Sequence, residues 1–514
     1  MSLVALPLGA ISTWVTPIWL LGIGAGVGLV LILVGSALIA ALSRKGGAAI
    51  LLGVREGILL PILLTVTLMA AIGVMSTALV RHPGRLVSSL TRVASVGEET
   101  LTFTINASPP VEYEEDIPRQ QIDLRFRRSE LDKIEFTAPQ DLLISEPGAG
   151  EGDEVAASDS EPRPAEFRHT GGEKTVWSSR HGATNPFSQE RVEGLQIANL
   201  GGGPTELKIL LQTDIRYPEV KAIPITAASV VIIFLLYFLQ RTWMPKMSAI
   251  ALATSKSEVA QPLFFVVLAI GLFALLLFIF IPYNTFGEDV KMLKDSGLML
   301  IMFLSILIAV WGAGTSVADE IEGRTALTVL SKPIGRPQFI LGKFLGIVWT
   351  VALMFLVLGL PFLMTISYKL VYDARETAET DPTWQACHLE MVRTVPGLLL
   401  AFMETVVMTS LAIAIATRLP LLANFVISFS IYVLGHLTPL IVNSSLGDFA
   451  PVAFIGQLIA TVVPVLDHFN IQAAVAAGVS VPYQYLLWTL VYCILYSSIA
   501  MLLALTMFED RDLA

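Results

Sequence analysis

Uninterrupted apolar blocks of about 20 residues recur along the chain, and they constrain its fold more than any other feature. The block at 262–281 contains no charged side chain, and neither does the block at 483–508. A helix needs about 20 apolar residues to cross about 30 Å of hydrocarbon. Charged residues make up only 15% of the chain, whereas a soluble domain carries about a quarter. The sequence therefore predicts a polytopic, mostly α-helical membrane protein.

Nine transmembrane helices are predicted from the length and composition of these blocks. They are residues 17–42, 57–80, 222–240, 262–281, 296–318, 343–367, 395–417, 420–442 and 483–508. The first block is rich in glycine, and its glycines are Gly22, Gly24, Gly26, Gly28 and Gly35. Small residues let helices approach closely in lipid. These glycines could form a seam where helices pack closely, or they could be flexible filler; both interpretations are open.

Residues 449–481 are predicted to re-enter the membrane without crossing it. Pro464 interrupts their apolar stretch, and Asp467 and His468 close it. Backbone that does not span is tolerated at membrane depth where it is buried against protein or lines a cavity. If residues 449–467 crossed instead, the C-terminus would move to the opposite side of the membrane.

A polar segment at residues 81–221 interrupts the membrane pattern. Its short runs at 101–105, 121–126, 133–138 and 207–213 alternate apolar and polar residues. That alternation is typical of half-buried strands. We therefore predict a β-rich, sandwich-like domain between the second and third spans.

Two loops of this domain can also be predicted. Gly201, Gly202, Gly203 and Pro204 separate two apolar runs, which indicates a hairpin turn. Residues 145–164 are acidic and rich in small residues, proline and glycine. Such a composition cannot bury enough apolar surface to fold, so we predict a disordered insert there.

Lysine and arginine in short loops mark the cytoplasmic side of a membrane protein. The loops at 43–56, 241–261 and 319–342 are basic, and Arg418 lies in the short reversal before the eighth span. Placing all four in the cytoplasm gives one consistent topology, with the N-terminus outside and the C-terminus inside. The β-rich domain is then extracytoplasmic, and so is an acidic loop at 368–394.

These patterns divide the chain into four parts. They are the two N-terminal spans (1–80), the extracytoplasmic β-rich domain (81–221), the third span with a cytoplasmic loop (222–261) and a six-span core (262–514).

Several other chemistries lack their sequence signatures. The two cysteines, Cys387 and Cys493, indicate neither a disulfide framework nor a metal site. His169, His181 and His388 stand alone in polar surroundings and are expected to be solvated surface residues, because a metal site needs several converging ligands. The chain has no phosphate-binding P-loop and no basic nucleic-acid surface. We therefore predict no catalytic residue, no metal, no cofactor on this chain and no nucleic-acid partner.

The most informative segment is residues 319–342, between the fifth and sixth predicted spans. Acidic residues come first, then an apolar stretch, then a turn with proline and a basic residue. The residues that we single out, extending to the mouth of the sixth span, are Glu320, Glu322, Arg324, Thr325, Pro333, Arg336 and Lys343. We predict a short amphipathic helix followed by a bend, which offers a docking face for a soluble partner. Arg336 is expected to be free to hydrogen-bond with a partner's carboxylate.

This ordered pattern resembles the coupling segment of ABC type-2 transporter permeases, especially the branch with the nitrous-oxide-reductase accessory and gliding-motility permeases. The motif positions are Glu320, Glu322, Thr325, Pro333, Ile334, Arg336, Phe339 and Lys343. Residues 462–475 also resemble the family's stretch before its final span, although Val465 stands where the family has asparagine. The resemblance covers about the C-terminal half of the chain.

The resemblance implies a permease subunit of an ATP-driven exporter. Two permease chains, identical or different, would pair in the bilayer, and each would rest its 319–342 segment on an ABC ATPase subunit. ATP and Mg would then be bound by that ATPase, so this chain is not expected to be an enzyme. The implied location is a bacterial inner membrane. The domain at 81–221 would bind substrate or an extracytoplasmic partner, and the sequence does not indicate the substrate.

Two ionisable residues lie inside predicted spans. Glu404 is in the seventh span and His436 is in the eighth, and intramembrane ionisable groups are costly and often functional. They form a polar site facing a translocation cavity, or a structural contact between helices; both interpretations are open. Tyr432, one helical turn from His436, is expected to pack.

Other classes of function give different signals. A membrane scaffold or mechanotransmitting anchor, whose outer domain recruits a partner without moving cargo, would have nearly the same sequence features. A secondary transporter would show internal repeats and more ionisable groups at mid-membrane, and the sequence shows neither.

Overall fold

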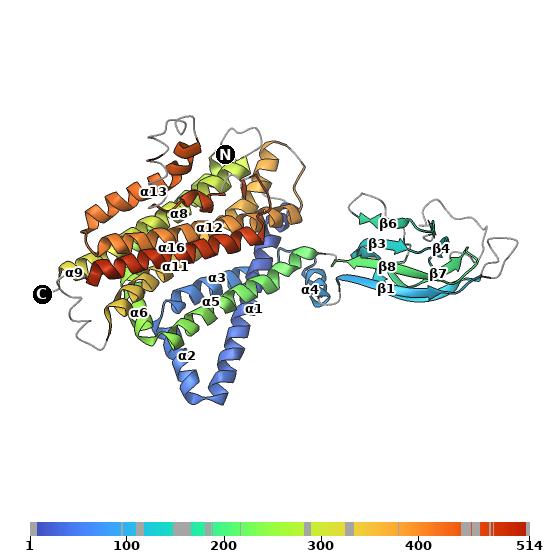
Figure 1. The fold of residues 1–514 in the computed structure, drawn as a ribbon, viewed down its shortest axis with the longest axis horizontal. Helices are drawn as coiled ribbons and strands as arrows, with labels where there is room; N and C mark the ends of the chain where they lie inside the picture. Colours follow the sequence, from blue (N-terminus) through green and yellow to red (C-terminus); the bar gives the residue numbers. More distant parts are fainter. Residues whose placement is uncertain are drawn as a thin grey trace. The chain divides into compact units, whose positions relative to one another are not determined.

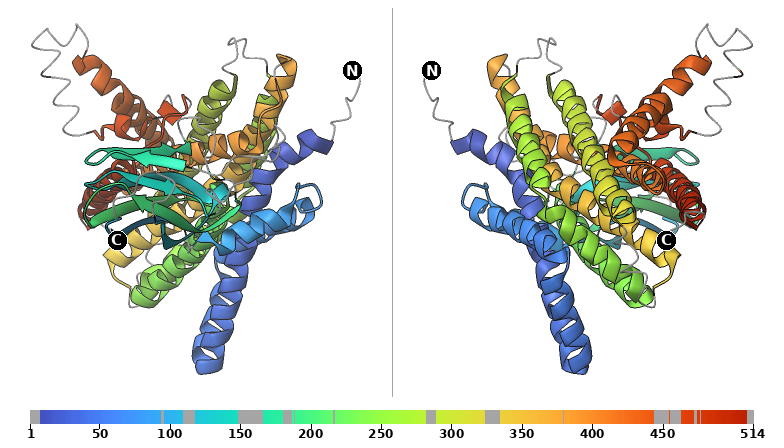
Figure 2. Two further views of the ribbon diagram at one scale, coloured as in Figure 1. Left: turned by 90° about the vertical axis from the view of Figure 1, so that its right-hand side faces the viewer. Right: turned by 90° about the vertical axis from the view of Figure 1, so that its left-hand side faces the viewer.

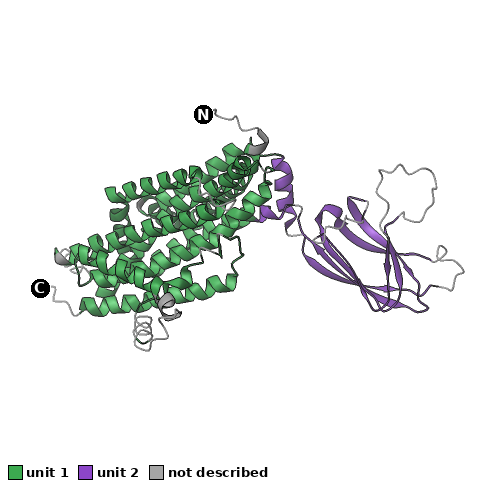
Figure 3. Ribbon diagram, turned by 90° about the horizontal axis from the view of Figure 1, so that it is seen from above, with its two compact units in different colours: residues 1–81, 222–514 green, residues 82–221 purple. Residues whose placement is uncertain are grey.

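The computed structural model describes most of the chain and separates it into two compact units. The described residues are 8–93, 96–108, 118–147, 166–179, 187, 189–215, 217–281, 289–323, 334–378, 380–443, 454, 463–471, 474–475 and 477–509, without the side chains of 8–10, 56, 166, 322 and 438–443. Unit 1 comprises Met1–Arg81 and Ala222–Ala514, and unit 2 comprises His82–Lys221 (Figure 3).

Unit 1 is a bundle of long apolar helices (Figure 1). They are α1 (Leu8–Leu42), α3 (Leu59–Ser76), α5 (Ala222–Trp243), α7 (Pro262–Phe280), α8 (Asp289–Ala313), α11 (Arg336–Glu376), α12 (Trp384–Ala416), α13 (Leu421–Asn443) and α16 (Tyr483–Glu509). Within the described part of the chain, eight segments are long and apolar enough to cross a membrane, and α13 contributes a shorter apolar helix, Leu421–Leu437. The predicted multi-pass, mostly helical fold is confirmed at this level.

Three glycines of α1 form a packing seam. A Cβ on Gly22 would lie 2.5 Å from the Cα of Gly73 in α3, and a Cβ on Gly73 would lie 2.6 Å from the carbonyl carbon of Gly22. Gly24 and Gly28 face α5 at similarly short range. Any larger residue would push these helices apart, so the packing interpretation holds for these positions. Gly35, by contrast, has open space around it.

The second half of α1 leaves the bundle together with α2 (Arg44–Glu56). Figure 1 and Figure 2 show these two blue helices diverging from the other helices of unit 1. The exposed apolar side chains of this arm include Leu31, Leu33, Val34, Leu38 and Leu42. A helix that is apolar on all sides is either buried or in lipid, so the second half of α1 presents a lipid-facing surface.

The predicted loop at 241–261 is mostly helical. Helix α6 (Pro245–Ala260) begins with a proline, which suits the first turn because its missing N–H has no intrahelical partner there. It lies against the start of α11, where a Cβ on Gly342 would be 2.7 Å from Ile250 and a Cβ on Gly346 would be 2.6 Å from Thr254. Two glycines four residues apart thus form the groove that receives α6.

The predicted acidic loop at 368–394 is wrong in its extent, because α11 continues to Glu376 and α12 already begins at Trp384. The charged residues there pair instead of lying in a loop. Lys369 is 1% exposed, with its Nζ 2.8 Å from Asp373 Oδ1. The buried Lys294 of α8 pairs with Glu390 of α12.

Unit 2 is a β-sandwich of two four-stranded antiparallel sheets, ordered β1-β8-β3-β6 and β2-β7-β4-β5. The strands are β1 (Glu98–Ile105), β2 (Gln120–Arg127), β3 (Leu131–Thr137), β4 (Leu142–Ser145), β5 (Glu166–His169), β6 (Lys174–Ser178), β7 (Arg191–Asn199) and β8 (Thr205–Thr213). Apolar residues of both sheets, such as Phe136 of β3 and Leu195 of β7, meet in one core. The predicted β-rich region between the second and third candidate spans is confirmed.

Two loop predictions for this unit need correction. The glycine-rich link at 201–204 joins β7 to β8, and these strands belong to different sheets. It is therefore a crossing between sheets and not a hairpin. Ser145, the first residue of the predicted acidic insert, belongs to β4 and is buried, as is Glu146. Residues 148–165 lie outside the described part.

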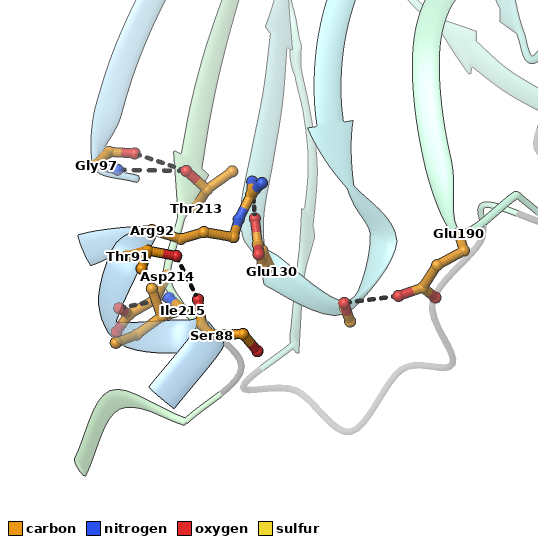
Figure 4. Close-up of polar contacts among 10 residues, drawn as sticks. Ser88, Thr91, Arg92, Gly97, Glu130, Glu190, Thr213, Asp214 and Ile215 are labelled. Atoms are coloured by element: carbon orange, nitrogen blue, oxygen red, sulfur yellow. Dashed lines mark hydrogen bonds and ion pairs between the residues drawn. The ribbon is translucent and has the colours of Figure 1, made fainter. Parts of the chain in front are cut away.

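Polar contacts hold the two ends of unit 2 side by side (Figure 4). The N–H of Gly97, just before β1, donates to Thr213 Oγ1 at 3.3 Å, and the N–H of Thr213 donates to the Gly97 carbonyl at 3.0 Å. Arg92, which caps α4 (Pro83–Thr91), donates to Glu130 at 2.6 Å. Adjacent ends allow a domain to be inserted into another chain segment without separating its flanks.

The segment at 449–481 is only partly described. It includes η8 (Leu466–Phe469), one turn of 3-10 helix. Leu466 is buried against α13, where a Cβ on Gly435 would lie 2.8 Å from its side chain. Most of the apolar half, including 455–462, lies outside the described residues, so the re-entrant path stays a prediction.

Candidate functional site

The segment singled out in the sequence emerges from a distorted helix end. Helix α8 is followed by a π-helical turn, η6 (Gly314–Ala318), and by α9 (Asp319–Glu322). A π-turn inserts an extra residue into the helical ladder and occurs often at functional sites. Arg324, Thr325 and Pro333, with the predicted flat helix, lie outside the described residues, as does the side chain of Glu322.

An ion pair joins the two stems of this segment. Lys343 in α11 is 6% exposed, and its Nζ lies 2.6 Å from Oε1 of Glu320 in α9. Removing Glu320 would leave the buried Lys343 ammonium without its counter-charge, which costs about 3–5 kcal/mol. Glu320 and Lys343 therefore hold α9 against α11, and the lysine is not presented to a partner.

Arg336 is also engaged within the chain. Its Nη1 donates a hydrogen bond of 3.0 Å to the carbonyl oxygen of Glu509, and its guanidinium lies 6.0 Å from the ring centre of Phe508. Both contacts are at the C-terminal end of α16, where the helix dipole favours a cation. The expectation that this guanidinium is free was wrong, because it fixes the start of α11 to the end of α16.

A second polar cluster, which the sequence did not reveal, lies beside this pair. Glu258 near the end of α6 is 4% exposed. Thr315 of η6 donates to its Oε1 at 3.2 Å, and the amide of Gln261 donates to its Oε2 at 3.1 Å. The indole N–H of Trp311 in α8 donates to Gln261 at 2.5 Å. The cluster therefore connects α6 to the end of α8.

Burial governs the charge of Glu258. Desolvation raises the pKa of its carboxyl from 4.5 to about 7, against the opposing effects of the Thr315 hydrogen bond and the nearby Lys343 ammonium. The only sequence signal was a glutamate three residues before a Gln-Pro span start, which by itself is a common surface arrangement.

Glu404 and His436 lie together inside unit 1. Nε2 of His436 is 3.4 Å from Oε1 of Glu404, and Glu404 is 1% exposed. Nδ1 of His436 is 3.1 Å from the Tyr432 carbonyl oxygen. A carbonyl only accepts, so Nδ1 carries a hydrogen and Nε2 faces the carboxyl.

Two apolar cavities lie near these helices. One of about 70 Å³ lies between α8 and α13 and is lined by Phe303, Ile306, Leu307, Val310, Phe425, Phe429 and Tyr432. Tyr432 thus packs beside His436, as expected, and also lines a cavity. A larger groove of about 420 Å³ runs between α11, α12 and α16, with Phe344, Val406 and Met501 among its lining residues.

Two of the three isolated histidines are buried, which contradicts their expected solvation. His169 is fully buried between the backbone of Ala138 and the Thr175 hydroxyl. His388 of α12 is 7% exposed, and His181 lies outside the described residues. Among the described side chains, no group of three or more His, Cys, Asp or Glu could hold a metal ion.

No protein-family model matches the chain, and no curated protein matches it. The functional interpretation therefore rests on the residues and on their geometry.

Proposed function

We propose that the chain is the membrane-spanning permease subunit of an ATP-driven exporter of the ABC type-2 class. The observation that carries the proposal is the Glu320–Lys343 pair, which joins the two stems of the 319–342 segment. A segment can transmit force to spans only if both of its ends are fixed to them. In this proposal, the residues between the stems dock on a separate ATPase subunit that binds ATP and Mg.

The two stems would transmit the motion to different helices. The first continues α8 through the π-turn η6, and the second begins α11. Closure of the ATPase dimer would push on both, shifting the bundle between two arrangements as a ligand biases a two-state element. A second permease chain would complete the pathway, and unit 2 would bind substrate or an extracytoplasmic partner. The location that fits this role is a bacterial inner membrane.

The Glu404–His436 pair is proposed as a polar site for the cargo pathway. It combines a buried carboxyl with a neighbouring imidazole, and the imidazole lies one helical turn from a tyrosine that lines a cavity. Ionisable groups at membrane depth usually pair and mark pathways. In this role, Glu404→Gln should reduce export while leaving membrane insertion intact, because a neutral amide is less costly to bury than a carboxylate.

The test is co-purification of the chain with its ATPase, with hydrolysis and export assayed on the same preparation. Glu322→Ala combined with Arg336→Ala should weaken ATPase association and uncouple hydrolysis from export. The second substitution would act by releasing the start of α11 from the end of α16. Arg55→Ala is the matched control, because Arg55 is an exposed basic residue at the end of α2 and is not part of the 319–342 segment. The control should retain association and coupling.

Retained coupling in the double variant would contradict a transmission role for 319–342.

A membrane scaffold is the second candidate, and it is favoured by the size of unit 2, which spans His82–Lys221. A scaffold would bind the ATPase and respond to Glu322→Ala with Arg336→Ala, yet wild-type chain would move no cargo and Glu404→Gln would have no effect.

A further inference from the structure

Glu258 occupies a position where three structural elements meet. It belongs to α6, its Oε1 accepts from Thr315 in the π-turn η6, and its Oε2 accepts from Gln261. Gly312 of α8 provides the space, because a Cβ there would lie 3.1 Å from Oε2. The carboxyl is thus enclosed by the end of α8 and sheltered from solvent.

The charged groups that face Glu258 come from the stems of the 319–342 segment. They are Glu320 of α9 and Lys343 of α11, which pair with each other at 2.6 Å. Thr315, Gln261 and Trp311 are uncharged. When Glu258 is ionised, these three charged groups carry a net charge of one negative unit, and when Glu258 is protonated they are neutral together.

We propose that Glu258 is a proton-operated latch that holds α6 against the end of α8. Protonated Glu258 keeps the contact closed, because its carboxyl proton can be donated to Thr315 Oγ1 while the Thr315 hydroxyl donates to the Trp311 carbonyl oxygen. Ionised Glu258 favours a conformation in which α6 separates from η6 and the carboxylate meets solvent. The proposal goes beyond the permease role, and the latch itself does not depend on that role. Only its consequence for coupling rests on the proposed function.

The direction follows from linkage between protonation and conformation. In the closed arrangement, the pKa of Glu258 is about 7, whereas an exposed carboxyl has its ordinary value of 4.5. The closed arrangement therefore binds the proton more tightly, so lower pH favours it. Raising the pH from 6 to 8 should increase the open fraction on the order of tenfold, with the change levelling off above pH 8.

The contacts of α6 connect the latch to other helices of unit 1. It lies in the glycine groove of α11, and η6 leads directly into α9. Opening the contact would free the first stem from α6 while the Glu320–Lys343 pair still ties that stem to α11. The latch would thus set how firmly α8 and α6 move together.

Hydrogen exchange of residues 311–323 in the purified full chain tests the latch without an ATPase. In the wild type, exchange should rise on the order of tenfold from pH 6 to pH 8 after correction for the intrinsic pH dependence of amide exchange. Glu258→Gln imitates the protonated acid in shape and charge. This variant should stay protected at both pH values.

Glu320→Gln distinguishes Glu258 from its neighbouring carboxyl. The negative charge of Glu320 helps to raise the pKa of Glu258, so removing that charge should move the transition to lower pH without abolishing it. The latch is overturned if the wild type shows no transition, if Glu258→Gln keeps the wild-type transition, or if Glu320→Gln alone abolishes it. These outcomes are independent of ATPase binding, so failure of the permease proposal would leave them unchanged.

Discussion

The two units of the molecule differ in how far the basic side chains of their ion pairs are buried. Unit 1 encloses charged side chains and pairs them, as with Lys343 and Glu320, where the lysine is nearly inaccessible. Unit 2 builds its core from apolar side chains such as Phe136. The basic partners of its ion pairs stay partly exposed, as with Arg92 beside the buried Glu130 and Lys174 beside Glu135. The difference indicates where a sequence change should act: apolar contacts stabilise the sandwich, whereas buried pairs fix the relative positions of helices in unit 1.

The largest expected effect is in the core of unit 2. Phe136 is fully buried between the sheets, so Phe136→Ala should remove about 3–5 kcal/mol from the unfolding free energy of this unit. Pulse proteolysis of the full chain, read at cleavage within 82–221, would measure it. Val176→Ala on β6 is the control, because Val176 is 48% exposed and should change the free energy by less than about 0.5 kcal/mol. Equal losses would show that the core does not dominate this unit.

The next largest effect should be a difference in lost stability between substituting Glu320 and substituting its partner Lys343. Glu320→Ala leaves the buried Lys343 ammonium without its counter-charge and should cost roughly 3 kcal/mol. Lys343→Met leaves Glu320, whose side chain is one third exposed, so water can solvate it and the loss should be roughly 1 kcal/mol. Thermal unfolding of the purified chain in detergent compares them. Equal losses would contradict the inference that burial of the lysine decides the energetics.

The smallest effect should come from the surface charges of unit 2. Hydrogen bonds from Lys133 and Lys174 lower the pKa of Glu135 below its ordinary 4.5. A lowered pKa stabilises the folded state above pH 4.5, and this contribution is lost as the pH falls through the folded-state pKa. The wild-type unit should therefore lose more stability than Glu135→Gln when the pH is lowered from about 5 to about 3. Parallel pH profiles in pulse proteolysis would show that these bonds contribute nothing.

The alternation of apolar and polar residues and the length of the apolar blocks predicted the main elements from the sequence. Apolar length identified the candidate spans, and alternation located β1, β2, β3 and β8. Strands β4, β5 and β6 were missed because they are only four or five residues long. Strand β7 was indicated only as an apolar run before the glycine-rich link, without its bounds. The extension of α11 was missed because Lys369 and Asp373 resemble loop residues until their pairing at 2.8 Å is known.

The candidate site was predicted less completely than the fold. Glu404 and His436 were found because ionisable residues stand out within apolar blocks, and their pairing depends on two helices that happen to face each other. Glu258 lies in a polar stretch where a glutamate is unremarkable. Its partner Thr315 is 57 positions away, so only the fold, which brings the end of α6 to the π-turn η6, places them together.

Helix α11 has 41 residues, which corresponds to about 60 Å at 1.5 Å per residue, twice the thickness of the hydrocarbon layer. A helix of this length extends beyond the hydrocarbon layer. Pro361 lies within it, and a proline removes a backbone hydrogen bond and favours a bend there. Motion at the end near Lys343 would therefore be partly taken up at Pro361 before it reached the end near Lys369.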